Sequence, residues 1–196
     1  MLPSNAALLI VDFQKAIDDP SWMSNGPRNN PDAEATIARL LAAWRASDRP
    51  IIHIRHDSTE PNSAYRPGQP GHDFKAEAVP IADEAVIPKK VNSAFIGTDL
   101  ELQLHAKGVS MLFVAGVITN NSVEATVRMA GNLGFDTRLI EDACFTYARR
   151  DHAGILRTAG EVHSMSLANM HGEYCTVVTS DSVLMELASS AGEGKQ

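Results

Sequence analysis

VSMLFVAGVITNNS, residues 109–122, is the segment from which the architecture is inferred. Its first half, residues 109–115, is an apolar run of the kind found in strands buried on both faces of a parallel sheet. A helix is expected from about residue 121 to Leu133, where Gly134 ends it. A buried strand that turns directly into a helix is the repeating unit of an open α/β sheet.

The same alternation extends in both directions from this segment. Further strands are predicted at residues 7–12, 50–55, 85–87, 136–140 and 174–179, with helices between them. Three helix starts are predicted: Asn30 with Pro31, a capping box of Thr98 and Glu101, and Ser180 or Asp181. No linker interrupts the pattern. We therefore predict a single α/β domain over residues 1–196, a three-layer Rossmann-like open sheet of six parallel strands with helices on both faces.

The composition argues against nucleic-acid and membrane partners. A formal net charge of -7 leaves no basic surface that tracks a phosphate backbone. No apolar run reaches the ~18 residues that a membrane helix needs, and the first residues lack a signal-peptide pattern. Cys144 and Cys175 lie far apart in apolar surroundings, which predicts two reduced core thiols. We expect a cytoplasmic protein that acts on a small molecule and needs no cofactor.

Three polar features fall where predicted strands end. Asp12 closes the first strand, Lys89 and Lys90 follow the third, and residues 116–122 follow the fourth. Ligands of such sheets bind beyond the carboxyl ends of the strands, so these features are expected to converge. Backbone N–H groups at the helix start favour an anion and can stabilise a developing oxyanion. Each feature alone is typical of an ordinary loop residue, but together they predict an acyl-transfer site centred on Ser122.

Several short segments follow one another in a characteristic order. They are LIVDFQ (9–14), Lys89 followed by SAFIGTDL (93–100), GVIT (116–119), VEAT (123–126), MAGNLGF (129–135), EDA (141–143) and EVHSMSLAN (161–169). Each segment alone is weak evidence, but the order and the spacing are specific. In these segments the chain resembles the isochorismatase-like superfamily of cysteine hydrolases over nearly its whole length.

The resemblance implies a catalytic triad of Asp, Lys and Cys. Asp12 and Lys89 match the first two members, with Lys90 as the alternative lysine, and Ser122 stands where the family has cysteine. It also implies a cis peptide bond between Val117 and Ile118, and an oxyanion hole formed by the backbone amides of Ile118 and Ser122. Substrate contacts are expected from Gln14, His56, Phe95, Asn120, Asn121 and Tyr147. The loop at residues 56–80 and Trp22 are expected to shape the choice of substrate.

Ser122 is the departure from the family pattern. A thiol has a pKa near ~8.5 and an unactivated hydroxyl one nearer ~15.7, a difference on the order of 10 kcal/mol in ease of deprotonation. Three accounts stay open: an engineered Cys→Ser change, a lineage that uses serine, or a lineage that has lost hydrolysis and kept the pocket. The neighbouring Asn121 also departs from the family, which favours native divergence.

Metal binding is predicted to be absent. The nicotinamidases among the relatives hold a metal with an Asp-x-His motif and a further histidine, whereas this chain has His53, His56 and Asp57. Residues three apart point to opposite faces of a strand, so the two histidines are poor joint ligands. His163, Asn169 and His171 are interpreted as packing residues of a helix face, without a direct catalytic role.

The leading hypothesis is a hydrolase that cleaves a C–N bond of a small amide or ureido compound; isochorismate itself is less favoured. The rival is a catalytically impaired or inactive family member that serves as a small-molecule binding or scaffold protein. A homodimer or higher homo-oligomer is expected, with the helix around Met165 and Leu167 as the candidate contact.

Overall fold

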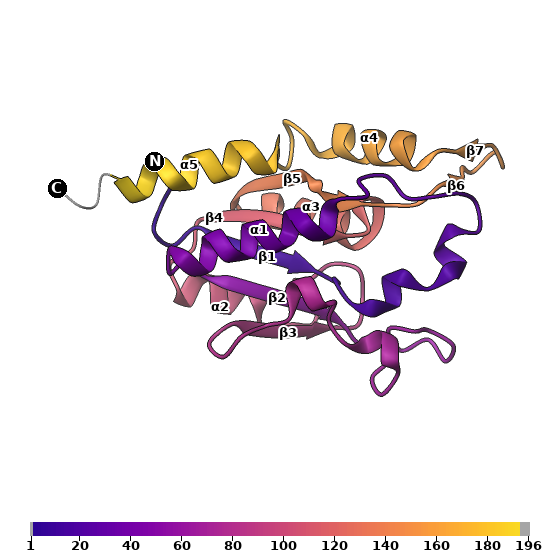
Figure 1. The fold of residues 1–196 in the computed structure, drawn as a ribbon, viewed down its shortest axis with the longest axis horizontal. Helices are drawn as coiled ribbons and strands as arrows, with labels where there is room; N and C mark the ends of the chain where they lie inside the picture. Colours follow the sequence, from indigo (N-terminus) through magenta and orange to yellow (C-terminus); the bar gives the residue numbers. More distant parts are fainter. Residues whose placement is uncertain (1, 193–196) are drawn as a thin grey trace.

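The computed structural model describes residues 2–192 and contains a six-stranded parallel sheet (Figure 1). The strands lie in the order β3-β2-β1-β4-β5-β8, and every neighbouring pair is parallel. Their bounds are β1 (Ala7–Val11), β2 (Ile51–His56), β3 (Ala85–Lys89), β4 (Met111–Val117), β5 (Asp136–Phe145) and β8 (Thr176–Val178). The predicted fold class is confirmed. β5 extends past the predicted residue 140 as far as Phe145.

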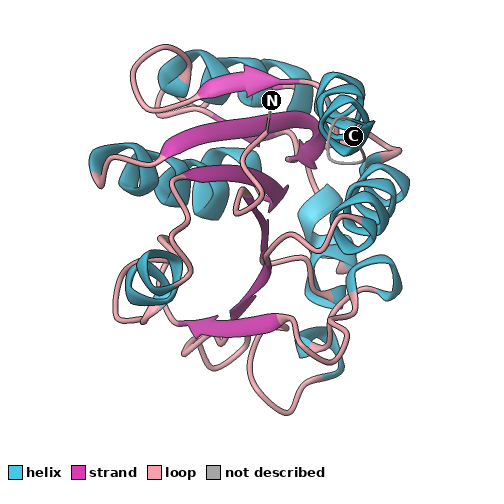
Figure 2. Ribbon diagram, turned by 90° about the vertical axis from the view of Figure 1, so that its left-hand side faces the viewer, coloured by secondary structure: helices cyan, strands magenta, loops and turns pink. Residues whose placement is uncertain are grey.

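Helices cover both faces of this sheet, as Figure 2 shows. They are α1 (Ala33–Ala46), α2 (Leu100–Ala106), α3 (Glu124–Asn132), α4 (Ala159–Met170) and α5 (Ser180–Gly192). Shorter elements are the 3-10 turns η1 (Lys15–Asp18), η2 (Pro20–Met23), η3 (Pro70–His72) and η4 (Ala76–Ala78), the π-helical turn η5 (Thr119–Val123), and a hairpin of β6 (Arg149–Arg150) and β7 (Leu156–Arg157). Within residues 2–192, no helix combines the length and apolarity needed to cross a membrane.

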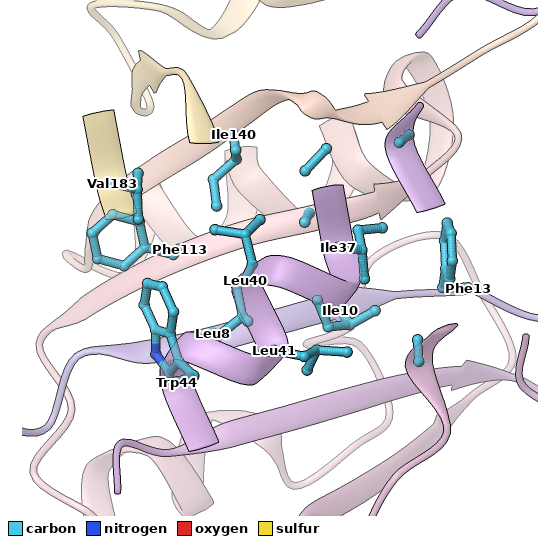
Figure 3. Packing of buried hydrophobic residues seen from close by; sticks show 14 of the residues in the cluster. Leu8, Ile10, Phe13, Ile37, Leu40, Leu41, Trp44, Phe113, Ile140 and Val183 are labelled. Carbon is cyan, nitrogen blue, oxygen red and sulfur yellow. The ribbon is translucent and has the colours of Figure 1, made fainter. Parts of the chain in front are cut away.

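The alternation of side chains along β1 divides the core between the two faces. Leu8 and Ile10 pack with Ile37 of α1 in one cluster, which Figure 3 shows from close by. Leu9 packs with Val127 of α3 in the other cluster. All five side chains are fully buried, and each such burial stabilises the fold by roughly 1.5–3 kcal/mol. β1 is therefore fixed from both sides, and so is the position of the residue that follows it.

The first helix does not start as predicted. α1 begins at Ala33 after Asp32, and Asn30 has a left-handed backbone with φ of 45°. The Asn30 side chain instead donates to the carbonyls of Glu141 and Cys144, at 2.9 and 2.6 Å. The prediction of Asn30 as the helix cap was wrong because its side chain bonds β5, a contact with a distant segment that local residue preferences do not indicate.

The other two predicted caps are also wrong. Thr98 donates its hydroxyl to the Ala94 carbonyl at 2.6 Å and accepts the Leu100 N–H at 3.4 Å, but Asp99 is the N-cap of α2 and no bond between Thr98 and Glu101 completes a capping box there. At α5, the Thr179 hydroxyl accepts the Ser182 N–H at 3.3 Å. A capping box does occur at the start of α4, where Thr158 and Glu161 bond each other's backbone N–H groups. That pair has the spacing of the motif, although this capping box was not predicted.

Glu84 joins three elements at the end of the sheet opposite the candidate site. Its carboxylate accepts bonds from Arg45 of α1 at 2.7 and 3.0 Å, from the Ile81 N–H at 3.0 Å, and lies 2.8 Å from Nε2 of His53 in β2. Burial opposes ionisation, but the bonds from Arg45, Ile81 and His53 outweigh it and lower the pKa of Glu84 from 4.5 to about 2. The ionised carboxylate therefore stabilises the folded state.

We expect Glu84→Gln to lower the free energy of unfolding by about 1–3 kcal/mol at pH 7. Because the folded pKa is depressed, the contribution is complete above pH 4.5 and is lost as the pH falls toward 2. Urea unfolding of the wild type and the variant at about pH 7 and pH 3 measures this, and the difference should shrink at the lower pH. Glu77→Gln, at an exposed position, is the matched control. An equal difference at both pH values would contradict the assignment.

Candidate active site

Asp12, Lys89 and Ser122 meet at the carboxyl edge of the sheet. Asp12 follows β1, Lys89 is the last residue of β3, and Ser122 lies in η5 after β4. The Lys89 Nζ donates to Asp12 Oδ2 at 2.7 Å, to Ser122 Oγ at 3.2 Å and to the Val91 carbonyl at 3.0 Å. All three side chains are buried, whereas the neighbouring Lys90 is exposed. The structure thus brings together the three residues that the sequence analysis placed at this edge.

The backbone of β1 and β4 brings these groups close. Asp12 has a left-handed φ of 52°, and the Gln14 N–H returns to its carbonyl at 2.8 Å, so the chain turns sharply after the strand. Gly116 pairs with Val11 and has φ of 127°, and a Cβ there would lie 2.2 Å from the Val11 carbonyl oxygen. Only glycine permits this approach, which sets the end of β4 beside Asp12.

The segment between β4 and α3 is a π-helical turn. The Val117–Ile118 peptide bond, where the resemblance implies a cis bond, is cis in the structure. The Asn121 and Val123 N–H groups both donate to the Ile118 carbonyl, at 3.0 and 3.4 Å. α3 begins only at Glu124, so Ser122 lies within the turn that precedes the helix.

The two oxygens of the Asp12 carboxylate differ in their hydrogen bonding. Oδ2 accepts from Lys89, while Oδ1 is buried and has no hydrogen-bond partner among the described residues. Burial raises the pKa of Asp12 above 3.8, and the Lys89 ammonium opposes that rise. A buried carboxylate with a raised pKa accepts a proton more readily than an exposed one.

His56 and Tyr65 lie next to this cluster. His56 Nδ1 is 3.5 Å from the Lys89 Nζ. Burial lowers the pKa of His56, with the Asp12 charge opposing, so the imidazole is neutral near pH 7. The Tyr65 ring stands edge-on to His56 with 5.6 Å between ring centres, and burial and the nearby Asp12 charge raise its pKa well above 10.0. Tyr65 was not predicted: the length of its loop indicated function, but no spacing singles out this residue.

Two predicted substrate contacts serve the protein's own structure. The Gln14 amide donates to the carbonyls of His56 and His72 at 3.2 and 2.8 Å and accepts the His56 N–H at 2.7 Å. It therefore fixes the loop after β2. The Phe95 ring stacks on Phe135 at 6.0 Å and packs against the core on the α2 and α3 face.

Of the remaining predicted contacts, Asn120 and Asn121 belong to the π-helical turn, and Tyr147 follows β5. Asn120 accepts the Thr146 hydroxyl and lines a cavity of about 920 Å³ beside α4 and the β6–β7 hairpin. Asn121 accepts from the Asn92 side chain at 3.1 Å at the surface. Tyr147 donates to the Ile17 carbonyl at 2.9 Å, and its ring stacks on Trp22 at 5.9 Å.

Neither cysteine replaces the missing thiol. Cys144 and Cys175 are buried and free. Burial raises the pKa of both thiols, that of Cys175 to about 11. Residues 2–192 hold no group of three or more His, Cys, Asp or Glu side chains that suits a metal ion. His53 and His56 do not share a site, because His53 bonds Glu84 while His56 lies next to Lys89.

Comparisons with known proteins identify the family of this chain. The model of the Isochorismatase domain matches residues 6–182. The isochorismatase family protein YrdC of Bacillus subtilis is 41% identical over 178 residues, covering 91% of this chain and 94% of that protein. Maleamate amidohydrolase of Pseudomonas putida is 27% identical over 203 aligned positions, covering 95% of this chain and 88% of that enzyme. A crystal structure of an isochorismatase-family protein from Chromobacterium violaceum superposes with a TM-score of 0.92, at 59% identity and 96% coverage of each chain.

Proposed function

The chain belongs to the isochorismatase family, and on that basis we propose that it hydrolyses the C–N bond of a small amide or ureido compound. The observation that carries the proposal is the double contact of Lys89 with Asp12 at 2.7 Å and with Ser122 at 3.2 Å. An amide is the preferred substrate class because one relative is named for maleamate hydrolysis. Serine at position 122 in place of the family cysteine is part of this proposal.

The proposed reaction begins with attack of Ser122 Oγ on the carbonyl carbon, while its proton passes to Asp12. Lys89 holds the carboxylate and the hydroxyl together and balances the negative charge. The N–H groups of Ile118 and Ser122 stabilise the oxyanion. The C–N bond then breaks, and the leaving amine takes the proton from Asp12. Water hydrolyses the resulting ester, which frees the acid and restores the Ser122 hydroxyl.

The surrounding residues divide into two groups in this proposal. His56, Tyr65, Asn120, Asn121 and Tyr147 contact or shape the substrate. Gln14 and Phe95 hold the loops and core that position them. On the outer face of α4, Met165 is 64% exposed while Leu167 packs against the core. A homo-oligomer that uses this face around Met165 belongs to the proposal.

The test is release of ammonia from a panel of small amides, including maleamate and N-carbamoyl compounds. We expect the wild type to exceed Ser122→Ala by at least ~10³-fold on its best substrate, the scale on which loss of a nucleophile reduces turnover. Equal rates for the two proteins on every compound would reject the proposal.

The hydroxyl at position 122 favours a second candidate, a binding protein built on the same pocket. A serine is much harder to deprotonate than a cysteine, and the base of this cluster is Asp12, which shares Lys89 with Ser122. In that case an amide or its acid raises the melting temperature by mass action, and no ammonia is released.

A further inference from the structure

Helix α4 holds the turn that carries Ser122. His163 Nδ1 lies 2.8 Å from the Thr119 hydroxyl, and both residues are buried. One turn further along α4, the Ser166 hydroxyl donates to the Glu124 carboxylate at 2.6 Å and lies 3.2 Å from the Thr119 carbonyl. The Thr119 side chain is therefore fastened to α4, and Ser166 holds the first residue of α3 beside it.

The direction of the His163 bond follows from its protonation state. Burial lowers the pKa of His163, and the backbone of Glu141 opposes that shift. The imidazole is therefore neutral near pH 7 and has a single N–H. With Nδ1 facing the Thr119 hydroxyl, we assign this N–H to Nε2. Nδ1 is then an acceptor, and the Thr119 hydroxyl donates to it.

Thr119 lies in the chain between the two residues whose N–H groups are the proposed oxyanion donors. It follows Ile118 directly and precedes Ser122 by three residues, and the N–H groups of Asn121 and Val123 both return to the Ile118 carbonyl. A rotation of Thr119 therefore shifts Ile118 and Ser122 relative to Asp12 and Lys89, which belong to other strands. Acyl transfer tolerates errors of only about 0.5 Å in such groups.

We propose that His163 is a positioning residue for the acyl-transfer site: through the Thr119 hydroxyl it sets the place of Ser122 and the Ile118 amide. This inference rests on the proposed function. It differs from a simple packing role because it assigns the effect to one ring nitrogen. Loss of the acceptor at Nδ1 impairs the site even when a polar side chain is kept at position 163.

Three substitutions separate these features. Asparagine branches at Cγ as histidine does, so in His163→Asn the amide oxygen reaches the place of Nδ1. In His163→Gln the amide lies one carbon further out and reaches the place of Nε2 instead. His163→Leu removes the polar group altogether. Thr119→Val removes the hydroxyl while His163 stays intact. It tests the same contact from the other side, so the proposal can be tested even if a substitution at position 163 prevents folding.

The readout is independent of the natural substrate. Each change is made in the S122C variant, and the introduced thiol is alkylated with iodoacetamide, itself a small amide, with mass spectrometry locating the product. We expect His163→Leu, His163→Gln and Thr119→Val each to slow alkylation about tenfold, close to the ~1.4 kcal/mol of one hydrogen bond. His163→Asn should stay within about threefold of the parent. In the Ser122 protein the same changes should lower kcat and alter KM by less than about threefold.

The outcomes are distinct. Slow alkylation in the Leu, Gln and Val variants, with recovery in the Asn variant, supports the positioning role. An Asn variant as slow as the Leu variant, or no loss in Thr119→Val, overturns it. Thermal melting of every variant shows whether a slow protein is folded. If the wild type releases no ammonia from any amide while the alkylation order holds, the proposed function fails and the positioning role of His163 stands.

Discussion

Lys89→Met is expected to abolish turnover and to lower the free energy of unfolding by about 3–5 kcal/mol, the loss typical of breaking a buried ion pair. Methionine retains most of the side-chain length, but it removes the ammonium that lies 2.7 Å from Asp12 Oδ2. The Asp12 carboxylate is then buried without a counter-charge, and its other oxygen already has no partner among residues 2–192. Urea unfolding and ammonia release measure the two effects.

Two controls separate stability from catalysis at Lys89. Lys90→Met changes the exposed neighbour and should alter stability by less than about 0.5 kcal/mol. The double change Asp12→Asn with Lys89→Met removes both charges, so most of the lost stability should return while activity stays absent. A Lys89→Met protein as stable as the wild type would show that the pair does not carry opposite charges in the folded state.

The convergence of Asp12 and Lys89 was predictable because it follows from two features of the sequence, the buried strands and their parallel arrangement. A buried apolar run indicates a strand, and parallel strands present their carboxyl ends at one edge of the sheet. Once β1, β3 and β4 are recognised, the residues at their ends are expected at one edge, and the structure places Asp12 and Ser122 within hydrogen-bond reach of Lys89. The strand order β3-β2-β1-β4 then decides how close they come, because it keeps these strands within one part of the sheet.

The parts that were not predictable depend on contacts between distant segments. Asn30 has the right residue type for a helix cap, but it bonds β5 instead. Tyr65 lies beside His56 in a loop that is held by Gln14 at the His72 carbonyl and by the bond of the Ser58 N–H to the Tyr65 carbonyl. His163 was assigned to helix packing, since nothing in its own segment indicates that its partner is Thr119 in the site. Local sequence carries no record of such pairings.

Ser122→Cys is expected to raise turnover of the best amide by roughly 10²–10⁴-fold. The full difference in ease of deprotonation, on the order of 10 kcal/mol, is an upper bound because an alkoxide is the stronger nucleophile once formed. Asp12 is the base within reach, and although burial raises its pKa, it remains a carboxylate. Such a base, with a lysine beside it, suits a thiol better than a hydroxyl. The thiol variant should also accumulate a covalent acyl-enzyme that mass spectrometry detects, whereas Ser122→Ala should form none.

The comparison of Ser122→Cys with the wild type decides between the accounts of this position. If the variant turns over amides and the wild type does not, the native hydroxyl is not a working nucleophile and the binding function is the better account. If the wild type matches or exceeds the variant, the prediction is wrong, and the site must activate serine by more than Asp12 and Lys89. The neutral His56, 3.5 Å from Lys89, is then the first group to replace, because it alone among the neighbours of Lys89 is a neutral base. A wild type faster than its thiol variant would therefore assign the chain to a lineage that uses serine.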